Sequence, residues 1–233
     1  KGQIIARLSD VRPDGTAMLI SLGLLNLRHR EGFEAKVNCV PDETFEAEIN
    51  LDQSAYHLPA GHKLCLSLST SYWPYCWPEG EAFSLSLSQG QIDIPLCPST
   101  AIEMGFAPAP PVETRDMKLL SETHESKGWQ TMPDGTRVLT IKGDRGRRED
   151  VASGVITDVW MQEIWSIHPD RPDNAKVEIT WIRGFGRGNW RAHSKAHIAM
   201  QGTRDSFKIS QRLEAWNGDE PAFDKSWTAS VPR

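Results

Sequence analysis

The sequence predicts an all-β protein, because its apolar residues recur with a period of two and its punctuation is that of turns. A period of two places alternate side chains on one face of a strand. Proline, glycine and aspartate cluster between the alternating segments, as they do in turns. The only helical fragment that the pattern allows is a short turn around 52–56. We therefore expect a first β region at 1–105, a Pro-rich linker at 106–116 and an antiparallel β-meander at 117–233.

Four strands are expected in the first region, at 3–11, 16–30, 44–51 and 62–70. Residues 44–51 alternate most clearly, with one face made of Phe45, Ala47, Ile49 and Leu51. Within 16–30 the apolar positions change parity after Gly23, which predicts a β-bulge at that glycine. The sequence Arg12-Pro13-Asp14-Gly15 predicts the turn that joins the first two strands. The carboxylates of Asp10 and Asp14 could suggest calcium, but capping of the turn by an Asx side chain is the favoured interpretation.

The second region follows the run Ala107-Pro108-Ala109-Pro110-Pro111, which favours an extended connector. We expect about five strands there, at 154–168, 176–183, 190–200, 207–215 and 222–229. A glycine-rich hairpin connection is expected over 184–189, and Asn217-Gly218-Asp219 is a strong hairpin turn. Residues 143–150 are highly charged, which predicts a mobile loop.

Composition excludes some classes of protein. Apolar residues are 39% of the chain, enough for a packed core. Mean hydropathy is −0.46, and no run approaches the roughly 18 apolar residues of a membrane helix, so no membrane partner is expected. The net charge of −5 gives no global argument for nucleic acid. No basic and apolar leader follows Lys1, so we expect a cytoplasmic piece of a longer protein, without a signal peptide.

The four cysteines leave two interpretations open. Cys39, Cys65, Cys76 and Cys97 contain no CxxC pair, which argues against a zinc ribbon. Two disulfides are arithmetically possible. Small buried thiols in a reduced protein are the favoured interpretation.

Two segments carry a family pattern. Residues 5–15, ending in Pro13-Asp14-Gly15, and residues 61–74, beginning Gly61-His62-Lys63-Leu64, resemble two strand motifs of the C-terminal, non-catalytic jelly-roll domain of the X-Pro dipeptidyl-peptidase and cocaine-esterase-like serine hydrolases. Arg28-His29-Arg30 and the segment 41–51 fall in order between them, and the resemblance covers about 3–98. It implies a galactose-binding-like β-sandwich, here a partial one. It also implies a parent serine hydrolase of peptidase or esterase type, with an α/β-hydrolase catalytic domain.

No catalytic residue transfers to this chain from that resemblance. The nucleophile of an α/β-hydrolase needs a Gly-x-Ser-x-Gly elbow between a strand and a helix, and the sequence contains no such motif. We therefore expect an accessory region that packs on its own catalytic domain and shapes access to the substrate, without cofactor or metal. It could also support a homo-oligomer.

Four residues are the candidates for a ligand or interface role: Trp73, Tyr75, Trp77 and His62. The three aromatic residues lie in a proline-braced loop, where packing at an interface is favoured over contact with a sugar or apolar substrate. His62 is expected to fix the Pro59–Gly61 turn by a hydrogen bond. A carbohydrate-binding module is the alternative function, because the loop and the nine tryptophans suit sugar stacking.

Two further patterns are weaker. His193 and His197 have a spacing that suits zinc on a helix, but on a strand they lie about 13 Å apart at 3.3 Å per residue. Residues 174–213 hold eight basic and two acidic side chains, which give a local charge of +6. Basic and aromatic residues at 183–191 could bind single-stranded nucleic acid. A basic outer face that docks on an acidic neighbouring domain is favoured, so no nucleic-acid partner is expected.

Overall fold

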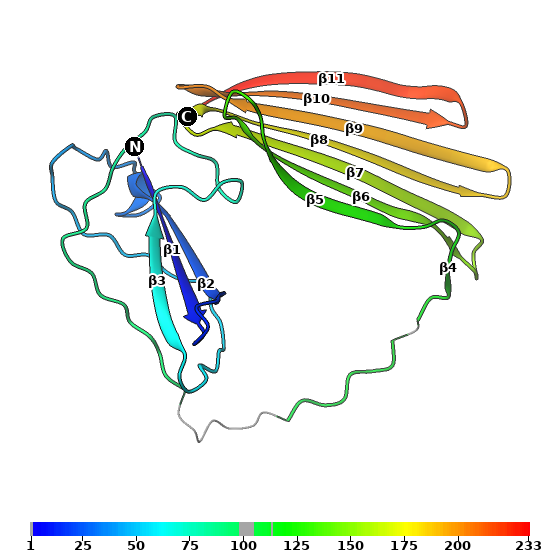
Figure 1. Cartoon of the computed structure of the whole chain (residues 1–233). Helices are drawn as coiled ribbons and strands as arrows, with labels where there is room; N and C mark the ends of the chain where they lie inside the picture. Colours follow the sequence, from blue (N-terminus) through cyan, green and yellow to red (C-terminus); the bar gives the residue numbers. More distant parts are fainter. Residues whose placement is uncertain (1, 98–104, 113) are drawn as a thin grey trace.

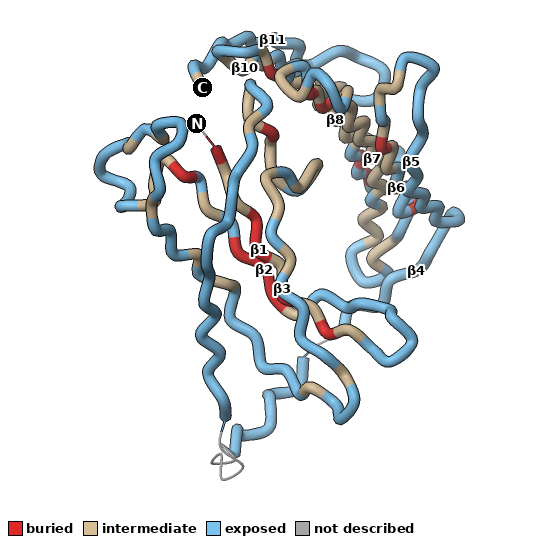
Figure 2. The backbone as a smooth tube through the Cα atoms, turned by 60° about the vertical axis from the view of Figure 1, so that its left-hand side comes forward, coloured by how far each residue is buried: buried red, intermediate tan, exposed pale blue. Residues whose placement is uncertain are grey.

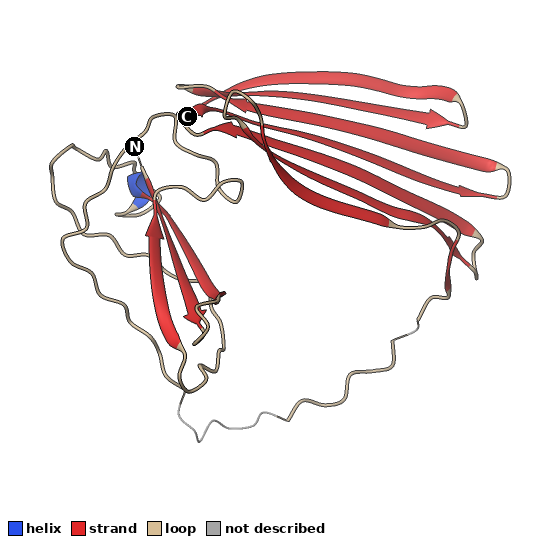
Figure 3. Ribbon diagram, viewed as in Figure 1, coloured by secondary structure: helices blue, strands red, loops and turns tan. Residues whose placement is uncertain are grey.

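The computed structural model describes residues 2–97, 105–112 and 114–233, and over these residues the chain is all-β (Figures 1 and 3). It forms one three-stranded and one eight-stranded sheet, and both are antiparallel. The expected all-β class is therefore confirmed. A single 3-10 turn, η1 (Leu27–His29), follows the second strand, and 52–56 contains no helical turn. Residues 98–104 and 113, at the expected end of the first region and within the expected linker, lie outside the described residues.

The small sheet has the order β2-β1-β3, with β1 (Gln3–Val11) between β2 (Ala17–Asn26) and β3 (Lys63–Ser69). Its hairpin turn is the one the sequence predicts: Gly15 N–H donates to the Arg12 carbonyl at 2.9 Å, and Gly15 adopts φ +85°. The Asp14 carboxylate accepts from the backbone N–H and the hydroxyl of Thr16, at 2.9 and 2.7 Å. These bonds are the expected Asx cap.

The β-bulge of the small sheet is not at Gly23, so that prediction is wrong. Leu8 pairs with Ser21 and Ser9 pairs with Leu19, which leaves Ile20 as the extra residue. Gly23 serves a close approach instead, because a Cβ on it would lie 2.5 Å from the carbonyl oxygen of Asn50. The backbone around Asn50 can therefore cross β2 only where a side chain is missing.

Residues 44–51 form no strand, which corrects a second expectation. The segment ends at β2, where Asp52 N–H donates to the Leu22 carbonyl at 2.9 Å and the Ser21 hydroxyl donates to the Asp52 carbonyl at 2.5 Å. Phe45 lies under the Arg30 guanidinium, 4.9 Å from its ring centre. The alternation of apolar side chains thus reflects an extended segment that packs across the sheet edge without joining its ladder.

The large sheet has more strands than the expected five. Its order is β11-β10-β9-β8-β7-β6-β4, and β5 pairs with β6 on the same side as β4. The strands are β4 (Met117–Leu119), β5 (His124–Thr131), β6 (Arg137–Asp150), β7 (Val155–His168), β8 (Arg171–Arg187), β9 (Trp190–Gly202), β10 (Ser206–Asn217) and β11 (Glu220–Pro232). Each consecutive pair from β5 to β11 is a hairpin, so the region is the expected meander with additional and longer strands.

Two boundaries differ from the sequence prediction for identifiable reasons. The charged segment 143–150 is no loop but the second half of β6, with a register shift between Asp144 and Arg147. This bulge hides the alternation, and Gly146 enables it with φ +68°. The glycine-rich segment 184–189 belongs mostly to β8, which ends at Arg187, and only 188–189 form the turn.

Pairing register gives the large sheet two chemically different faces. We call one the apolar face; it carries Leu139, Ile141, Met161, Trp165, Val177, Ile179, Trp181, Ala196, Ile198, Met200, Phe207, Ile209, Leu213, Phe223, Trp227 and Val231, with the polar Glu163, Arg183, Gln211 and Lys225 among them. We call the other the polar face; it carries Lys142, Asp144, Trp160, Gln162, Thr180, Ile182, Lys195, His197, Arg212, Glu214, Asp224 and Ser226. Figure 2 shows that few positions of this sheet are buried.

Candidate functional site

The proline-braced aromatic loop joins the two sheets. Trp73 meets Trp165 of β7 edge-on at 5.6 Å between ring centres, and Trp77 meets Phe207 of β10 in the same manner at 5.6 Å. The two loop tryptophans also contact each other at 5.0 Å. Edge-to-face contacts at these distances are the favoured geometry of aromatic pairs. Trp73 and Trp77 therefore act in packing, and their partner is the large sheet of this same chain.

Tyr75 takes no part in that contact. The residue is 63% exposed, and its ring lies 5.4 Å from the ring of Tyr72. The three aromatic residues named by the sequence are thus divided by the structure. Two anchor the loop, and one remains available at the surface.

Polar contacts extend this junction along the chain after Trp77. The Arg204 Nε–H donates to the Glu81 carboxylate at 2.8 Å, and the Arg233 Nη2–H donates to the Pro78 carbonyl at 2.9 Å. Burial lowers the pKa of Arg233, although Glu79 and Asp173 oppose that effect. The junction therefore combines stacked rings with charge-assisted bonds over sequence separations of 123 and 155 residues.

Glycines make the close contact possible. A Cβ on Gly80 would lie 2.6 Å from the Arg204 carbonyl, and one on Gly202 would lie 3.1 Å from the indole nitrogen of Trp77. The indole N–H groups of Trp73 and Trp77 are buried without an acceptor among the described residues. Both rings consequently contribute packing to the junction rather than hydrogen bonds.

His62 belongs to a second cluster, centred on a buried carboxylate. Asp10 of β1 is 1% exposed and accepts from the Tyr56 hydroxyl at 2.6 Å. The His62 Nδ1 lies 2.8 Å from both Asp10 carboxylate oxygens. The expected turn bond exists too, but it comes from the backbone N–H of His62 to the Pro59 carbonyl at 3.2 Å.

Tyr56 is the member of this cluster that the sequence analysis missed. Its hydroxyl is the main cause that lowers the pKa of Asp10, with a smaller contribution from His62. The same bond raises the pKa of Tyr56. An aspartate and a histidine in contact could form part of a catalytic triad, but among the described residues no serine, threonine or cysteine side chain bonds to this His62. The cluster ties the segment before β3 to β1.

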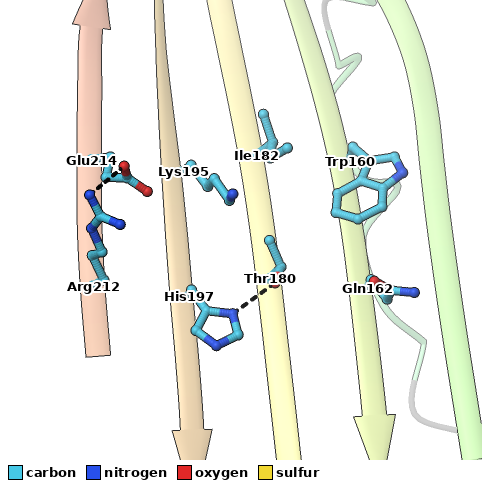
Figure 4. A pocket seen from close by; sticks show the side chains of 8 residues that line it. All are labelled: Trp160, Gln162, Thr180, Ile182, Lys195, His197, Arg212 and Glu214. Carbon is cyan, nitrogen blue, oxygen red and sulfur yellow. Dashed lines mark hydrogen bonds and ion pairs between the residues drawn. The ribbon is translucent and has the colours of Figure 1, made fainter. Parts of the chain in front are cut away.

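The polar face contains an open hollow of about 460 Å³ (Figure 4). Four strands line it in two rows: Trp160 and Gln162 on β7, Thr180 and Ile182 on β8, Lys195 and His197 on β9, and Arg212 and Glu214 on β10. Arg212 pairs with Glu214 at 2.9 Å and with Asp224 at 2.8 Å. The Thr180 hydroxyl bonds His197 Nδ1 at 3.0 Å.

Three groups in this hollow have no ion pair or hydrogen bond to another described side chain: the Lys195 ammonium, the Gln162 amide and the Trp160 indole. Figure 4, which looks onto the sheet, shows the Trp160 ring nearly broadside. An exposed aromatic face beside unpaired donors can hold a polar ligand that carries an apolar ring face.

The strands show where the His193–His197 pair and the basic and aromatic segment 183–191 lie. His193 and His197 both lie on β9, where His193 stacks on Trp216 at 4.5 Å while His197 bonds Thr180. No group of three metal-ligating side chains occurs among the residues described. In the 183–191 segment Arg183 lies over Trp181 on the apolar face, whereas Arg191 pairs with Asp158 on the polar face at 2.7 Å.

The cysteine side chains are less buried than the sequence predicts. Cys65 is exposed, and Cys39 and Cys76 are intermediate, with no disulfide at any of these three. Burial raises the pKa of the Cys76 thiol, although its backbone bond to Tyr72 opposes this. No helix among the described residues has the length and apolar character needed to cross a membrane.

Comparison with known proteins places the first region. The model of the X-Pro dipeptidyl-peptidase C-terminal non-catalytic domain matches residues 1–130, more than half of the chain. No curated protein and no solved structure matched the chain. The match begins before the two strand motifs, includes the aromatic loop and extends into β5. The chain therefore belongs to the family of X-Pro dipeptidyl-peptidase C-terminal non-catalytic domains.

Proposed function

We propose that this chain is the accessory region of a serine hydrolase of X-Pro dipeptidyl-peptidase or acyl-esterase type. In this role it packs on the α/β-hydrolase catalytic domain, covers one of its walls and shapes access to the substrate pocket, without catalysing the reaction. The family membership supports the accessory role. The cytoplasmic location expected from the sequence stays a prediction.

One observation carries the packing role: the apolar face of the large sheet is covered at one end only. Where the aromatic loop lies, Leu139 and Val177 are 2% and 5% exposed. Further along the same face Trp227, Phe223 and Ile198 are 40%, 44% and 39% exposed. A face of this kind is expected to be buried against a partner.

The size of the face suits a permanent partner. Seven strand positions at about 4.8 Å, each about 13 residues long at about 3.3 Å, give the whole face, including the end under the aromatic loop, an area on the order of 1,400 Å². This exceeds the roughly 800 Å² that one partner contributes to a standard interface. A domain of the same polypeptide is the partner that fits, because covalent linkage gives it a high effective concentration near the sheet.

The experiment places a charge on each face in the full-length hydrolase. Ile198→Lys puts an ammonium in the middle of the apolar face, whereas Ser210→Lys puts the same group on the polar face of the neighbouring strand. We expect Ile198→Lys to lower the melting temperature of the catalytic domain and to change KM for bulky substrates, with Ser210→Lys close to wild type. Equal behaviour of the two variants would contradict the packing role.

Catalysis is tested on the purified 233-residue chain. We expect no hydrolysis of p-nitrophenyl esters or Xaa-Pro amides, and no labelling by a fluorophosphonate that reacts with activated serines. Turnover that this reagent blocks would refute the non-catalytic assignment.

Carbohydrate binding is a second candidate, favoured by the polar-face hollow rather than by the aromatic loop. Trp73 and Trp77 are occupied in packing, whereas the Trp160 ring is free to stack on a sugar beside Lys195 and Gln162. A glycan array, followed by titration calorimetry with Trp160→Ala and the apolar-face control Trp190→Ala, tests it. Binding that only Trp160→Ala weakens supports this candidate, and a silent array dismisses it.

A further inference from the structure

The last strand, β11, forms one edge of the large sheet. It pairs with β10 on one side only, and all 13 of its residues are exposed. In Figure 1 it is the red strand along the outer border. An edge strand presents a row of backbone N–H and C=O groups that can pair with another strand.

Register fixes which backbone groups of β11 point outward. Arg233 N–H donates to the Asp205 carbonyl at 3.0 Å, so position 233 faces β10. Along an antiparallel strand, the backbone N–H and C=O groups of successive residues point alternately toward the partner strand and away from it. The N–H and C=O groups of Asp224, Ser226, Thr228 and Ser230 therefore point away from the sheet. Pro232 belongs to this outward set, which is consistent because proline has no N–H to satisfy.

The four outward residues make a window without proline or bulge. Natural edges are protected by bulges, prolines, short length or charged side chains, and the charged residues within 224–230 are Asp224 and Lys225, at the end near the hairpin. The only register shift of β11 lies between Ala215 and Trp216 on its partner, close to the hairpin, and both of its prolines lie outside 224–230. The opposite border differs, because it is divided between the eight-residue β5 and the three-residue β4.

We propose that β11 pairs with β11 of a second copy of this chain, antiparallel and about a two-fold axis at Trp227. Asp224 then lies opposite Ser230 of the other copy, and Ser226 lies opposite Thr228. All four outward residues of each copy are used, and each of these pairs exchanges two backbone hydrogen bonds. Because the axis is perpendicular to the sheet, the apolar faces of the two copies lie on one side of a continuous sheet.

The side chains agree with this register. The two Trp227 rings face each other at a non-hydrogen-bonded pair, where Cα atoms are about 4.5 Å apart and aromatic pairs stabilise the ladder. Phe223 meets Val231, and Lys225 meets Ala229, so no two like charges are opposed. A shift of the axis to Lys225 would oppose two ammonium groups, which disfavours that register.

The isologous pairing closes after two copies. Both copies use the same edge strand for the contact, so no free β11 edge remains for a third copy. The assembly therefore ends at a dimer rather than a fibre. This inference rests on the sheet alone and stands independently of the proposed accessory role. Sedimentation velocity of the full chain over a range of concentrations should accordingly show a monomer and a dimer, without larger species.

Charge substitutions test the register. The double variant Ser226→Glu, Thr228→Glu opposes two pairs of carboxylates across the axis, and the double variant Ser226→Lys, Thr228→Lys opposes two pairs of ammonium groups. We expect each variant alone to raise the dimer Kd by about tenfold or more, which is about 1.4 kcal/mol. An equimolar mixture of the two variants should recover the dimer, because each Glu then meets a Lys. Ser210→Glu, one strand inward on the same face, should leave Kd unchanged.

Several outcomes would overturn the proposal. A wild-type chain that stays monomeric at every concentration excludes the pairing. Larger polymers would show head-to-tail contacts through the other edge instead. A dimer that is indifferent to both double variants, or a mixture that does not restore it, excludes this register. Circular dichroism of each variant separates these results from loss of folding.

Discussion

Replacing Trp77 by alanine should loosen the large sheet from the small-sheet region, residues 2–97, whereas Tyr75→Ala should not. The two residues are two positions apart in one loop, so the pair is a matched comparison. Trp77 contacts Trp73 and Phe207 edge-on and its indole nitrogen is fully buried. Tyr75 is 63% exposed and has one ring neighbour, Tyr72.

The magnitude follows from area and ring contacts. A large aromatic side chain buries about 150–250 Å² when it is enclosed, which is worth about 4–6 kcal/mol at about 25 cal/mol per Å². Trp77 is of intermediate exposure, so about two thirds of that, roughly 3–4 kcal/mol, is expected to be lost with the ring. For Tyr75 the loss should stay within about 0.5–1 kcal/mol.

Urea denaturation followed by tryptophan fluorescence and by far-UV circular dichroism measures both variants. Hydrogen exchange adds the location, because Trp77→Ala should increase exchange at the end of β10 near Phe207. The far end of the sheet, around Trp216, should keep its protection. If Tyr75→Ala costs as much as Trp77→Ala, or if exchange rises along the whole sheet alike, the loop is not the anchor described above.

Three further predictions concern the small sheet. Gly23→Ala should destabilise the chain by about 1–3 kcal/mol in urea denaturation, because the new Cβ meets the Asn50 carbonyl; an unchanged midpoint would contradict this close approach. Tyr56→Phe should cost about 1–2 kcal/mol in the same assay by removing a hydrogen bond to the Asp10 carboxylate, and a neutral result would show that water replaces it. The pKa of Asp10 is lowered on folding, so its carboxylate stabilises the folded chain. This stabilisation is fully present above the unfolded pKa near 4 and is lost as the pH falls through the lower folded pKa. Asp10→Asn should therefore reduce the fall of the melting temperature at acid pH.

Local turn chemistry explains what the sequence predicts well. The turn at 12–15 is specified by proline and by a glycine that adopts positive φ, and it recurs unrecognised at Met132-Pro133-Asp134-Gly135. There Gly135 N–H donates to the Met132 carbonyl at 2.9 Å, and Asp134 accepts from Thr136 N–H at 2.9 Å. This second copy of the turn joins β5 to β6, so the same local pattern predicts that hairpin.

Pairing and long-range contact explain what the sequence misses. Residues 44–51 alternate as a strand does, yet Gly23 allows them to cross β2 instead of pairing with it. Charged β6 lies within a sheet whose polar face is open, so its residues need no apolar alternation over 143–150. Nothing in the local sequence indicates that Tyr56 and His62 converge on one carboxylate, because that meeting depends on β1, far away in the chain.

The junction at the aromatic loop decides how the two sheets act together. Although a Pro-rich segment separates them in sequence, Arg204 bonds Glu81 and the C-terminal Arg233 bonds Pro78. These contacts hold the end of β10 and β11 against the small-sheet region, while the opposite end of the apolar face stays uncovered. The catalytic domain that we propose for that face would therefore be oriented by the small-sheet region through the loop. The loop packs against β7 and β10 and leaves the outer border of β11 open. The catalytic domain and the second copy that we propose would therefore bind different parts of one sheet.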